Sequence, residues 1–403
     1  MTEDTRSTLE SSSAHTGGKE LMHSAAKKYR FLFISVPFGG IEIFMRNLRR
    51  PIEERKDIDS TWITIESQPS EVVAHLPIVS SNWTLKAGLV ARRRIRQLEN
   101  AGLHFDAIFV NHTIPLIFMR RFRNRVPVVL SLDTTAFLIG LYSKWYFNGT
   151  QHDHRFSEWA KKVLRVGVYS DASFILPWSN LVKRSLMNHY HIGEEKLRLV
   201  PPGIDLERWK PSGNPSYRGR SSKAQFRVLF VGGEFERKGG DVLLKVARRR
   251  EFQSFEFHFV TRAFHGAVPD NVFVYDNLHA NCDELIDLYQ RAHAFALPTR
   301  ADFAPTNAIC EAMAMGLPVI STNVGGLGET VVHGETGLIV PPDNEESLAD
   351  ALTLLASDEQ LCLNMGRNAR TRIEQENDIK KTAQTVIDHL VLAADQSRSG
   401  VSK

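Results

Sequence analysis

The sequence has few cysteines and no long hydrophobic run. Its 403 residues include only three cysteines, too few for a disulfide framework, which favours a reducing compartment. The best apolar candidate, Phe31 to Phe44, is interrupted by Pro37 and Glu42, so we expect no membrane-spanning helix. The polar first 20 residues lack the apolar core of a secretory signal. These absences predict a cytoplasmic protein.

An uneven charge distribution accompanies an ordinary globular composition. Hydrophobic residues make up 42% of the chain and charged residues 24%, which fits two to three folded domains. The net charge of +4 hides a basic first half, because residues 24–210 contain 28 Lys and Arg against 17 Asp and Glu, a net charge of +11. Residues 211–403 carry a net charge of −5. We therefore expect the first half to contact something anionic, unless its basic surface serves only solubility.

Short apolar runs of buried-strand length alternate with helix-period segments in both halves. In the first half we expect strands at Tyr29–Val36, Asp106–Asn111, Pro127–Leu132, Ala172–Pro177 and Leu197–Pro201, with helices at Leu85–Asn100 and Ser157–Tyr169. In the second half we expect strands at Phe226–Val231, Phe255–Val260, Val272–Tyr275, Ala294–Leu297 and Pro318–Ile320, with helices at Asp241–Arg250, Cys282–Ala292 and Asn307–Met315.

This alternation predicts an α/β protein with two doubly wound, Rossmann-like domains that face each other across a ligand cleft. Residues 1–28 are typical of a disordered tail, and residues 29–210 are expected to form the N-terminal domain. Residues 211–224, rich in Pro, Gly and Ser, predict a linker, and residues 225–376 the second domain. A last helix within residues 377–395 is expected to cross back to the N-terminal domain.

The first motif that carries chemistry follows the strand expected at Phe226–Val231. Gly232 and Gly233 end that strand, and a helix is expected just after Lys238-Gly-Gly. Glycines let the backbone approach a ligand closely, and the N–H groups at a helix start attract anions. With Arg237 and Lys238 supplying positive charge, the segment predicts a diphosphate site. The alternative is a plain strand–turn–helix with a stray lysine, since neither GxGxxG nor a P-loop is present.

The second motif places one carboxylate in a loop and another on a helix. Asp302 lies in the loop after the strand expected at Ala294–Leu297, and Glu311 lies on the second turn of the following helix. A carboxylate can accept two hydroxyl hydrogen bonds, as a ribose or sugar diol requires. The N–H groups of the loop from Ala304 to Thr306 lie at the helix start, where they can meet phosphate or sugar oxygens.

Together these segments resemble the donor-site signature of family 4 retaining glycosyltransferases, which have the two-domain GT-B fold. That signature is a carboxylate, seven residues, and then Glu-Ala-Met-Ala-x-Gly-x-Pro-Val, as in the segment from Glu311 to Val319. The resemblance covers residues 29–395. The other segments that agree in order are Gly39–Glu42, Val200–Asp205, Gly232–Gly239, Gly325–Glu329 and Gly334–Pro342.

The resemblance implies a role for each site residue. Lys238 would neutralise the donor diphosphate, Glu311 would hold the ribose hydroxyls, and Asp302 would contact the transferred sugar. Lys and Arg would replace a cation, so no metal or other cofactor is expected, and a donor phosphate oxygen would act as the base. The residues implied to bind the donor are Gly39, Gly40, Gly232, Gly233, Arg237, Lys238, Phe303, Ala304, Pro305, Thr306 and Glu311.

Three positions depart from the family pattern. Gly233 stands where the family usually has arginine, and Arg237 is the candidate substitute. Phe303 stands where the first carboxylate is expected, with Asp302 one residue early. After the strand at Pro127–Leu132 the family often places a histidine near the sugar, whereas here Asp133 follows and is our fourth candidate catalytic residue, beside Lys238, Asp302 and Glu311.

The resemblance implies a hexosyltransferase that moves a sugar from a nucleotide sugar to a sugar, lipid-linked or phosphorylated acceptor with retention. Basic clusters at Arg92–Arg96 and Arg120–Arg125 fit an anionic surface at the inner membrane face, or a phosphorylated acceptor, better than nucleic acid. Two alternatives stay open: a sugar-nucleotide epimerase of the same fold, and a catalytically silent GT-B binding module. Leu138–Phe156 could line an acceptor pocket or pack in the core, and His152–His154 is a weak metal candidate.

Overall fold

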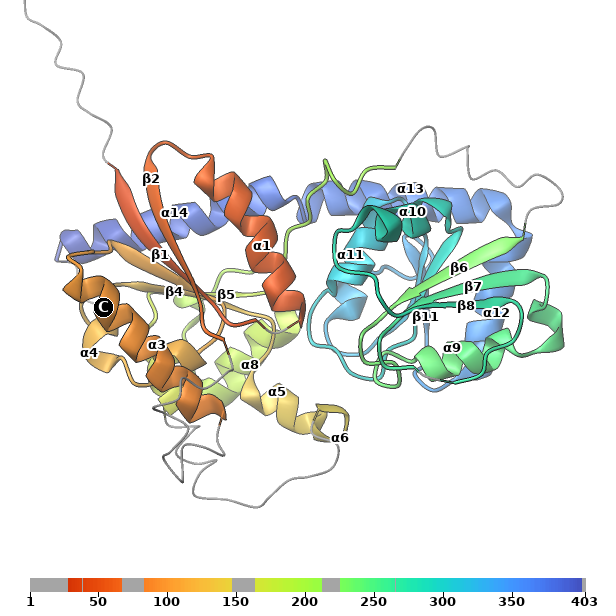
Figure 1. The fold of residues 1–403 in the computed structure, drawn as a ribbon, viewed down its shortest axis with the longest axis horizontal. Helices are drawn as coiled ribbons and strands as arrows, with labels where there is room; N and C mark the ends of the chain where they lie inside the picture. The colour runs from red at the N-terminus through yellow and green to blue at the C-terminus, as the bar shows by residue number, and fades with distance from the viewer. Residues whose placement is uncertain are drawn as a thin grey trace, which may run out of the picture.

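The computed structural model describes residues 28–37, 39–66, 83–146, 164–211, 225–264 and 266–400. Within them the chain forms two parallel β-sheets flanked by helices, which confirms the expected pair of α/β domains (Figure 1). The expected tail and linker lie, except at single end residues, outside the described residues. The same holds for His152–His154 and for the later part of Leu138–Phe156.

The N-terminal sheet has the strand order β2-β1-β3-β4-β5, and all of its pairings are parallel. Its strands are β1 (Tyr29–Ser35), β2 (Ile58–Thr64), β3 (Ala107–Val110), β4 (Val128–Leu132) and β5 (Phe174–Pro177). Its helices are α1 (Gly39–Glu53), α3 (Trp83–Asn100), α4 (Arg120–Arg123), α5 (Ala136–Leu141), α6 (Ser143–Tyr146), residues 164–171 and α8 (Asn180–Tyr190), with 3-10 turns at Ile114–Leu116 and Glu194–Lys196.

The C-terminal sheet has the strand order β11-β10-β9-β6-β7-β8, again with parallel pairing throughout. Its strands are β6 (Phe226–Val231), β7 (Phe255–Val260), β8 (Val272–Tyr275), β9 (Ala294–Leu297), β10 (Val319–Thr322) and β11 (Gly337–Val340). Its helices are α9 (Gly240–Ala247), α10 (Asp283–Arg291), α11 (Asn307–Ala314), α12 (Glu345–Ser357) and α13 (Glu359–Glu376), with 3-10 turns at Arg250–Phe252 and Leu327–Glu329.

The prediction of a strand at Leu197–Pro201 is wrong. The segment makes a single parallel bridge, between Leu197 and Ile175, and then continues as loop. Arg198 and Val200 donate backbone hydrogen bonds to β5, but Pro201 and Pro202 follow and have no N–H to continue the ladder.

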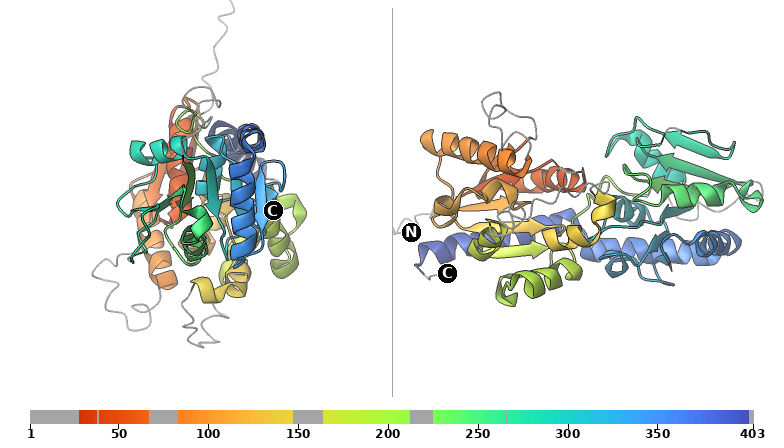
Figure 2. Two further views of the ribbon diagram at one scale, coloured as in Figure 1. Left: turned by 90° about the vertical axis from the view of Figure 1, so that its right-hand side faces the viewer. Right: turned by 90° about the horizontal axis from the view of Figure 1, so that it is seen from below.

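The last helix, α14 (Ile379–Arg398), leaves the C-terminal domain and packs against α1, β3 and β4. Its buried face, which includes Val386, Ile387 and Leu390, joins the same apolar cluster as Phe31 and Phe109 of the N-terminal sheet. Figure 2 shows the C-terminal helices running along one side of both domains. The last helix therefore contributes side chains to the core of the N-terminal domain.

Candidate active site

The expected site residues lie in loops that follow the carboxyl ends of strands in both sheets. Strand order reverses between β1 and β3 in one sheet and between β6 and β9 in the other. Doubly wound sheets bind ligands beyond the carboxyl strand ends at such points. Hydrogen bonds join these loops across the domains; among them, Ser179 Oγ donates to the Phe303 carbonyl (2.7 Å), and Asn307 Nδ2 donates to the Gly40 carbonyl (2.9 Å). The two carboxyl edges therefore face each other.

The loop between β6 and α9 is shaped by glycines. Gly239 has φ of 78°, and a Cβ there would overlap the carbonyl of Pro298, so the turn into α9 requires glycine. Gly232 lies under the Lys238 side chain, where an added Cβ would be 3.0 Å from that lysine's Cβ. A Cβ at Gly233 would meet nothing within 4 Å, so the absence of the family's arginine there is not a steric requirement.

Lys238 and Asp302 form a buried ion pair at the centre of these loops. Lys238 Nζ lies 2.7 Å from Asp302 Oδ1, and their side chains are 13% and 10% exposed. Arg237 Nη1 reaches the same carboxylate oxygen at 3.2 Å, and Thr299 Oγ1 donates to Oδ2 at 2.7 Å. Burial lowers the pKa of Lys238, and the Asp302 carboxylate opposes that effect. We call Arg237, Lys238, Thr299 and Asp302 the charged cluster.

Arg237 connects the charged cluster to the N-terminal domain. Its guanidinium lies over the ring of Tyr146 at the end of α6, 4.8 Å from the ring centroid, and donates to the Tyr146 hydroxyl (3.2 Å). The ring of Phe303 stacks on Tyr146 with centroids 5.4 Å apart and meets Tyr142 edge-on at 5.5 Å. Phe303, 5% exposed, thus packs against the N-terminal domain, while its neighbour Asp302 pairs with Lys238.

Asp133 follows β4 and lies on the N-terminal side of the same region. Burial raises the pKa of Asp133 to about 6; backbone hydrogen bonds oppose this rise, and the nearby Asp302 carboxylate adds to it. With a pKa of about 6, this carboxyl group is mostly ionised at pH 7, and its protonated fraction grows as the pH falls. It can both donate a hydrogen bond to a sugar hydroxyl and accept one from it.

Glu311 lies on α11, buried within the C-terminal domain. It is 3% exposed, and its Oε2 accepts a hydrogen bond from the Tyr289 hydroxyl of α10 at 3.0 Å. Burial raises the pKa of Glu311 to about 7, and the hydrogen bond from Tyr289 opposes this rise. Glu311 is thus held in one position beside a fixed hydroxyl.

The loop at the start of α11 offers fewer backbone N–H donors than the three residues Ala304 to Thr306 suggest. Thr306 is the N-cap, and its Oγ1 accepts a hydrogen bond from the N–H of Ile309 at 3.3 Å. Pro305 has no N–H, so only Ala304 and Thr306 of this loop can donate to a ligand. Gly39 and Gly40 form the first turn of α1 and approach α11 through the hydrogen bond from Asn307.

Sequence reasoning missed a further link between the domains. Glu329, in the Gly-Gly-Leu-Gly-Glu segment, accepts hydrogen bonds from the N–H groups of Asn180 (2.7 Å) and Leu181 (3.1 Å) at the start of α8. Gly326 makes this approach possible, because a Cβ there would lie 2.8 Å from the Cβ of Ser179, the residue before α8. The motif was visible in the sequence, but nothing in its spacing identified α8 as its partner. Tyr289, Thr299 and Asn307 were missed for the same reason.

The described residues contain neither a cluster that could hold a metal ion nor a helix that could span a membrane. Among them, no group of three or more His, Cys, Asp or Glu side chains is placed to hold a metal ion. No helix in the described part of the chain is both long and apolar enough to cross a bilayer.

Comparison with known families matches both halves of the chain. Residues 38–208 match the family described as Glycosyltransferase Family 4, and residues 225–358 match the family described as Glycosyl transferases group 1. The two matches together span most of the chain, and each corresponds to one of the two domains seen in the structure.

Individual relatives agree with these matches. The chain is 31% identical over 207 residues to the D-inositol 3-phosphate glycosyltransferase of Paenarthrobacter aurescens, an alignment that covers 47% of this chain and 50% of that protein. It is 25% identical over 337 residues to the glycogen synthase of Mycobacterium tuberculosis, covering 77% and 75% of the two chains. The chain thus spans about half the length of the first of these relatives.

Solved structures share the fold at low sequence identity. Sucrose-phosphate synthase from Thermosynechococcus elongatus superposes with a TM-score of 0.70 at 18% identity, covering 91% of this chain and all of that one. Anabaena HepE in complex with UDP-glucose gives a TM-score of 0.66 at 17% identity, covering 90% and 99%. These neighbours establish the two-domain arrangement.

Proposed function

The chain belongs to glycosyltransferase family 4 and has the GT-B fold, and we propose that it transfers a sugar from a nucleotide-sugar donor to an acceptor hydroxyl. We further propose that the transfer retains the anomeric configuration and needs no metal ion. The observation that carries this proposal is the buried charged cluster at the β6/β9 switch point, which faces Asp133 across the domains.

The charged cluster suits a diphosphate because its cations are buried. A buried ammonium without a counter-ion is costly, and in the free protein the Asp302 carboxylate supplies the opposite charge. A donor diphosphate brings two negative charges to the same place and can take over that role. Arg237 and Lys238 then supply the positive charge that a divalent cation supplies at other phosphate sites.

The remaining groups fit the other parts of a nucleotide sugar. Glu311 on α11 is suited to the two ribose hydroxyls, and the N–H groups of Ala304 and Thr306 are suited to phosphate oxygens. Displaced from Lys238, Asp302 becomes available to the sugar, which Asp133 approaches from the other domain. HepE was solved with UDP-glucose, so UDP-glucose is the first donor to test.

In the proposed reaction the acceptor oxygen bonds to the anomeric carbon as the bond from that carbon to the phosphate oxygen breaks. The acceptor's proton passes to the departing phosphate oxygen on the same face of the sugar, so no protein base is required. Arg237 and Lys238 stabilise the negative charge that develops on the leaving diphosphate. The same face is used by both groups, which retains the configuration.

The decisive experiment measures turnover with and without an acceptor. Nucleotide sugars are first screened by thermal shift, since a ligand that binds the folded state raises its stability by mass action. Transfer to an added acceptor, with release of nucleoside diphosphate and activity that survives EDTA, would support the proposal. A new sugar nucleotide formed without an acceptor would favour the epimerase, and binding without any turnover would favour the silent module. Loss of activity in EDTA that a divalent cation restores would contradict metal independence.

Lys238→Ala tests the assigned diphosphate site. Removing this charge-assisted contact should weaken nucleoside diphosphate binding by about ten- to a hundredfold, measured by titration calorimetry. The matched control is Lys245→Ala on α9, because Lys245 is 56% exposed and pairs with Glu345 at the surface. Equal affinity in both variants would place the diphosphate elsewhere.

A further inference from the structure

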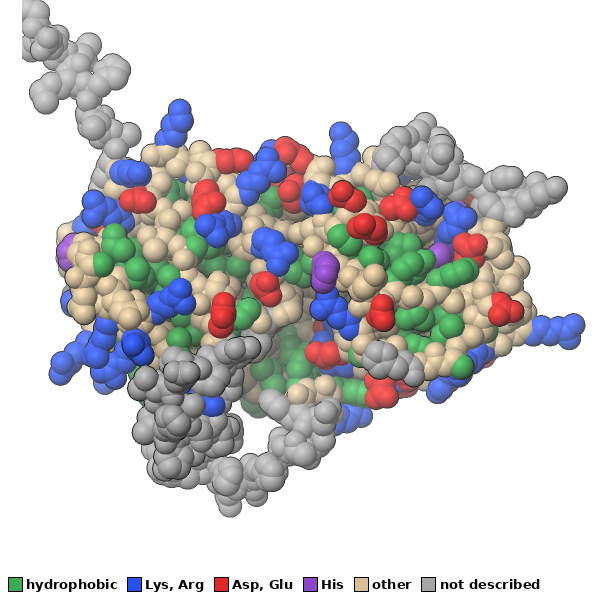
Figure 3. Space-filling model, in the orientation of Figure 1, with side chains coloured by type: hydrophobic (Ala, Val, Ile, Leu, Met, Phe, Trp, Pro, Cys, Tyr) green, Lys and Arg blue, Asp and Glu red, His purple; other side chains and the backbone are tan. Residues whose placement is uncertain are grey.

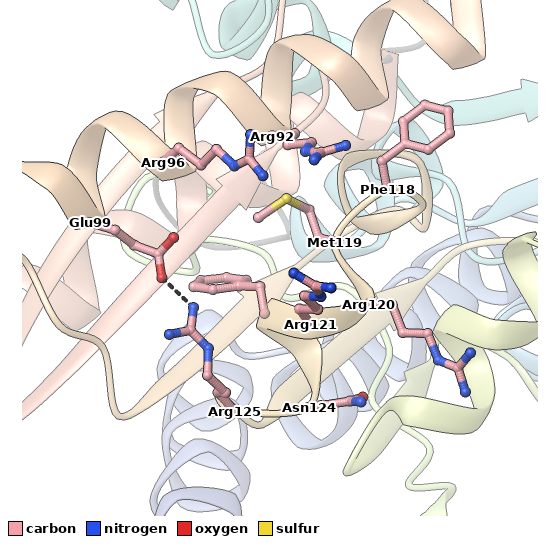
Figure 4. Close-up of a pocket in the computed structure, with 10 residues that line it drawn as sticks. Arg92, Arg96, Glu99, Phe118, Met119, Arg120, Arg121, Asn124 and Arg125 are labelled. Carbon is pink, nitrogen blue, oxygen red and sulfur yellow. Dashed lines mark hydrogen bonds and ion pairs between the residues drawn. The ribbon is translucent and has the colours of Figure 1, made fainter.

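A pocket of about 720 Å³ lies on the N-terminal domain, apart from the loops described above. It opens between the later turns of α3 and the segment 118–125, and its walls carry Arg92, Arg96, Arg120, Arg121 and Arg125. We call it the arginine pocket. Figure 4 shows Arg92 and Arg96 extending from α3 toward the segment that carries Met119, Arg120 and Arg121.

The positive charge of the arginine pocket is largely uncompensated. Arg125 is paired with Glu99 at 2.7 Å. For the guanidinium groups of the other four arginines, no carboxylate or other hydrogen-bond partner is found among the described residues. On α1 of the same domain, by contrast, Arg46, Arg49 and Arg50 each pair with a glutamate one turn away. Four guanidinium groups that line one pocket without acidic partners create a positive potential, which an anionic ligand would relieve.

The chemistry of the walls specifies the kind of anion. Guanidinium groups bind phosphate oxygens through paired, charge-assisted hydrogen bonds. The pocket floor is apolar, because Met119 and Phe122 are buried and Phe118 lines the side. Such a floor lowers the local polarity and offers contact to the carbon atoms that carry the phosphate. The pocket therefore suits a phosphate ester better than an isolated inorganic ion.

The arginine pocket lies at the opposite end of the N-terminal sheet from the loops of the candidate active site. The end of α3 leads into the amino end of β3, and α4 precedes the amino end of β4, whereas the charged cluster and Asp133 follow carboxyl strand ends. Figure 1 places α4 at the outer end of the N-terminal domain, away from the C-terminal domain. In Figure 3, Lys and Arg side chains gather at this end of the molecule.

We propose that the arginine pocket binds the phosphate monoester group of a ligand, at a site distinct from the nucleotide-sugar site. Two sources share this chemistry: a soluble sugar or polyol phosphate, and the head group of an anionic lipid such as phosphatidic acid. The proposal does not depend on the chain being an active transferase, because it rests only on the walls and charge of this pocket.

The test measures binding of glycerol 3-phosphate to the full chain by titration calorimetry. The variant Arg96→Gln with Arg121→Gln removes two pocket charges and should weaken binding by about tenfold or more. The matched control is Arg93→Gln with Arg94→Gln, which removes two charges from exposed positions of α3 that do not line the pocket, and should stay within about twofold of the parent. Lys238→Ala should bind as the parent does, which separates this site from the donor site.

Sedimentation with phosphatidylcholine vesicles, with or without phosphatidic acid, identifies the source. If vesicle binding requires phosphatidic acid, is inhibited by glycerol 3-phosphate and is lost only in the pocket variant, the ligand of the pocket is a lipid head group. Binding of glycerol 3-phosphate without vesicle binding assigns a soluble ester. The proposal is overturned if the parent does not bind glycerol 3-phosphate, if both double variants weaken binding equally, or if Lys238→Ala abolishes it.

Discussion

The family pattern has a carboxylate at the position of Phe303, whereas this chain has its carboxylate one residue earlier, at Asp302. Asp302 is held by Lys238, Arg237 and Thr299, all from its own domain. Phe303 packs on Tyr142 and Tyr146 from the other domain. The shift of the carboxylate by one residue therefore goes with an aromatic contact between the domains. In this arrangement Asp302 is the counter-ion of Lys238 in the free protein, and we propose that it becomes a sugar ligand once the diphosphate has replaced it there.

Asp302→Ala separates these two roles. Without its carboxylate, Lys238 and Arg237 are buried cations with less compensation, so the free protein should lose stability and nucleoside diphosphate should bind as tightly as before or more tightly. Sugar transfer should fall about ten- to a hundredfold, because the contact with the sugar is lost. Calorimetry and a turnover assay measure the two effects, with exposed Asp350→Ala on α12 as the control. A loss of diphosphate affinity like that of Lys238→Ala would contradict this account.

Glu311 should make stability depend on pH. Burial holds its pKa at about 7, above the ordinary value of 4.5, so the fold favours the protonated carboxyl. Its contribution to the free energy of unfolding is complete below about pH 4.5 and is lost as the pH rises through about 7. Glu311→Gln keeps an oxygen for the Tyr289 hydroxyl but cannot ionise, so it should avoid this loss of roughly 2–3 kcal/mol between pH 5 and pH 8.

Urea denaturation of the parent and of Glu311→Gln at both pH values measures this difference. Glu335→Gln makes the same substitution at an exposed position and should follow the parent. If the stabilities of Glu311→Gln and the parent change in parallel with pH, the carboxyl group of Glu311 is ionised in the folded protein throughout this range.

The sequence predicted which residue types gather at the site but not how they are paired. Glycines, Lys238 and Glu311 stand at fixed distances from strand and helix ends, so local patterns were enough to find them. The partners Tyr146, Tyr289 and Glu329 come from segments distant in the chain. No local periodicity reports such contacts, and without them the pairing of Lys238 with Asp302 could not be anticipated.

At the scale of elements, α8 shows how one domain stabilises a helix of the other. Ser179 is its N-cap, accepting a hydrogen bond from the N–H of Val182 at 3.2 Å and donating one to the Phe303 carbonyl. Glu329 from the C-terminal domain accepts from two further N–H groups of the first turn. A carboxylate at this position also meets the positive end of the helix dipole. The helix start is therefore complete only when both domains are in place.

Glu329→Gln should weaken this junction. The amide keeps one acceptor oxygen but loses the negative charge, and its NH₂ group opposes an N–H of α8. The expected loss is about 1–2 kcal/mol in the free energy of unfolding, measured by chemical denaturation. A loss no larger than that of the exposed variant Glu335→Gln would mean that the junction contributes nothing to stability.

The elements themselves were predicted unevenly, and the reasons are physical. Ala107–Val110 and Ala294–Leu297 are continuously apolar and lie where expected, because strands buried on both faces need such runs. β2, with the mixed sequence IDSTWIT, lies at a sheet edge and carries no such run, so it was missed. Leu197–Pro201 has a strand-like composition, but its prolines prevent pairing beyond one bridge.

At the scale of the whole molecule, the two domains are connected by the polypeptide chain as well as by contacts between their side chains. The chain passes into the second domain and then returns, through α14, to the first. Tyr29 at the start of β1 donates a hydrogen bond to Asp395 near the end of α14 (2.9 Å). Residues far apart in the sequence therefore share one core, and the apolar core beside the N-terminal sheet includes side chains of the last helix.

Leu390→Ala tests this dependence. Leu390 is fully buried in α14 against the N-terminal core, so its truncation should cost about 2–5 kcal/mol. Leu392→Ala, on the same helix but 46% exposed, is the matched control and should leave stability near that of the parent. Hydrogen exchange locates the effect: Leu390→Ala should lower the protection of β1, β3 and α1, more than 250 residues earlier in the chain. The C-terminal sheet should keep its protection, because α14 packs on the other domain. Faster exchange in β6 and β9 than in β1 and β3 would show instead that α14 stabilises the domain it leaves rather than the one it joins.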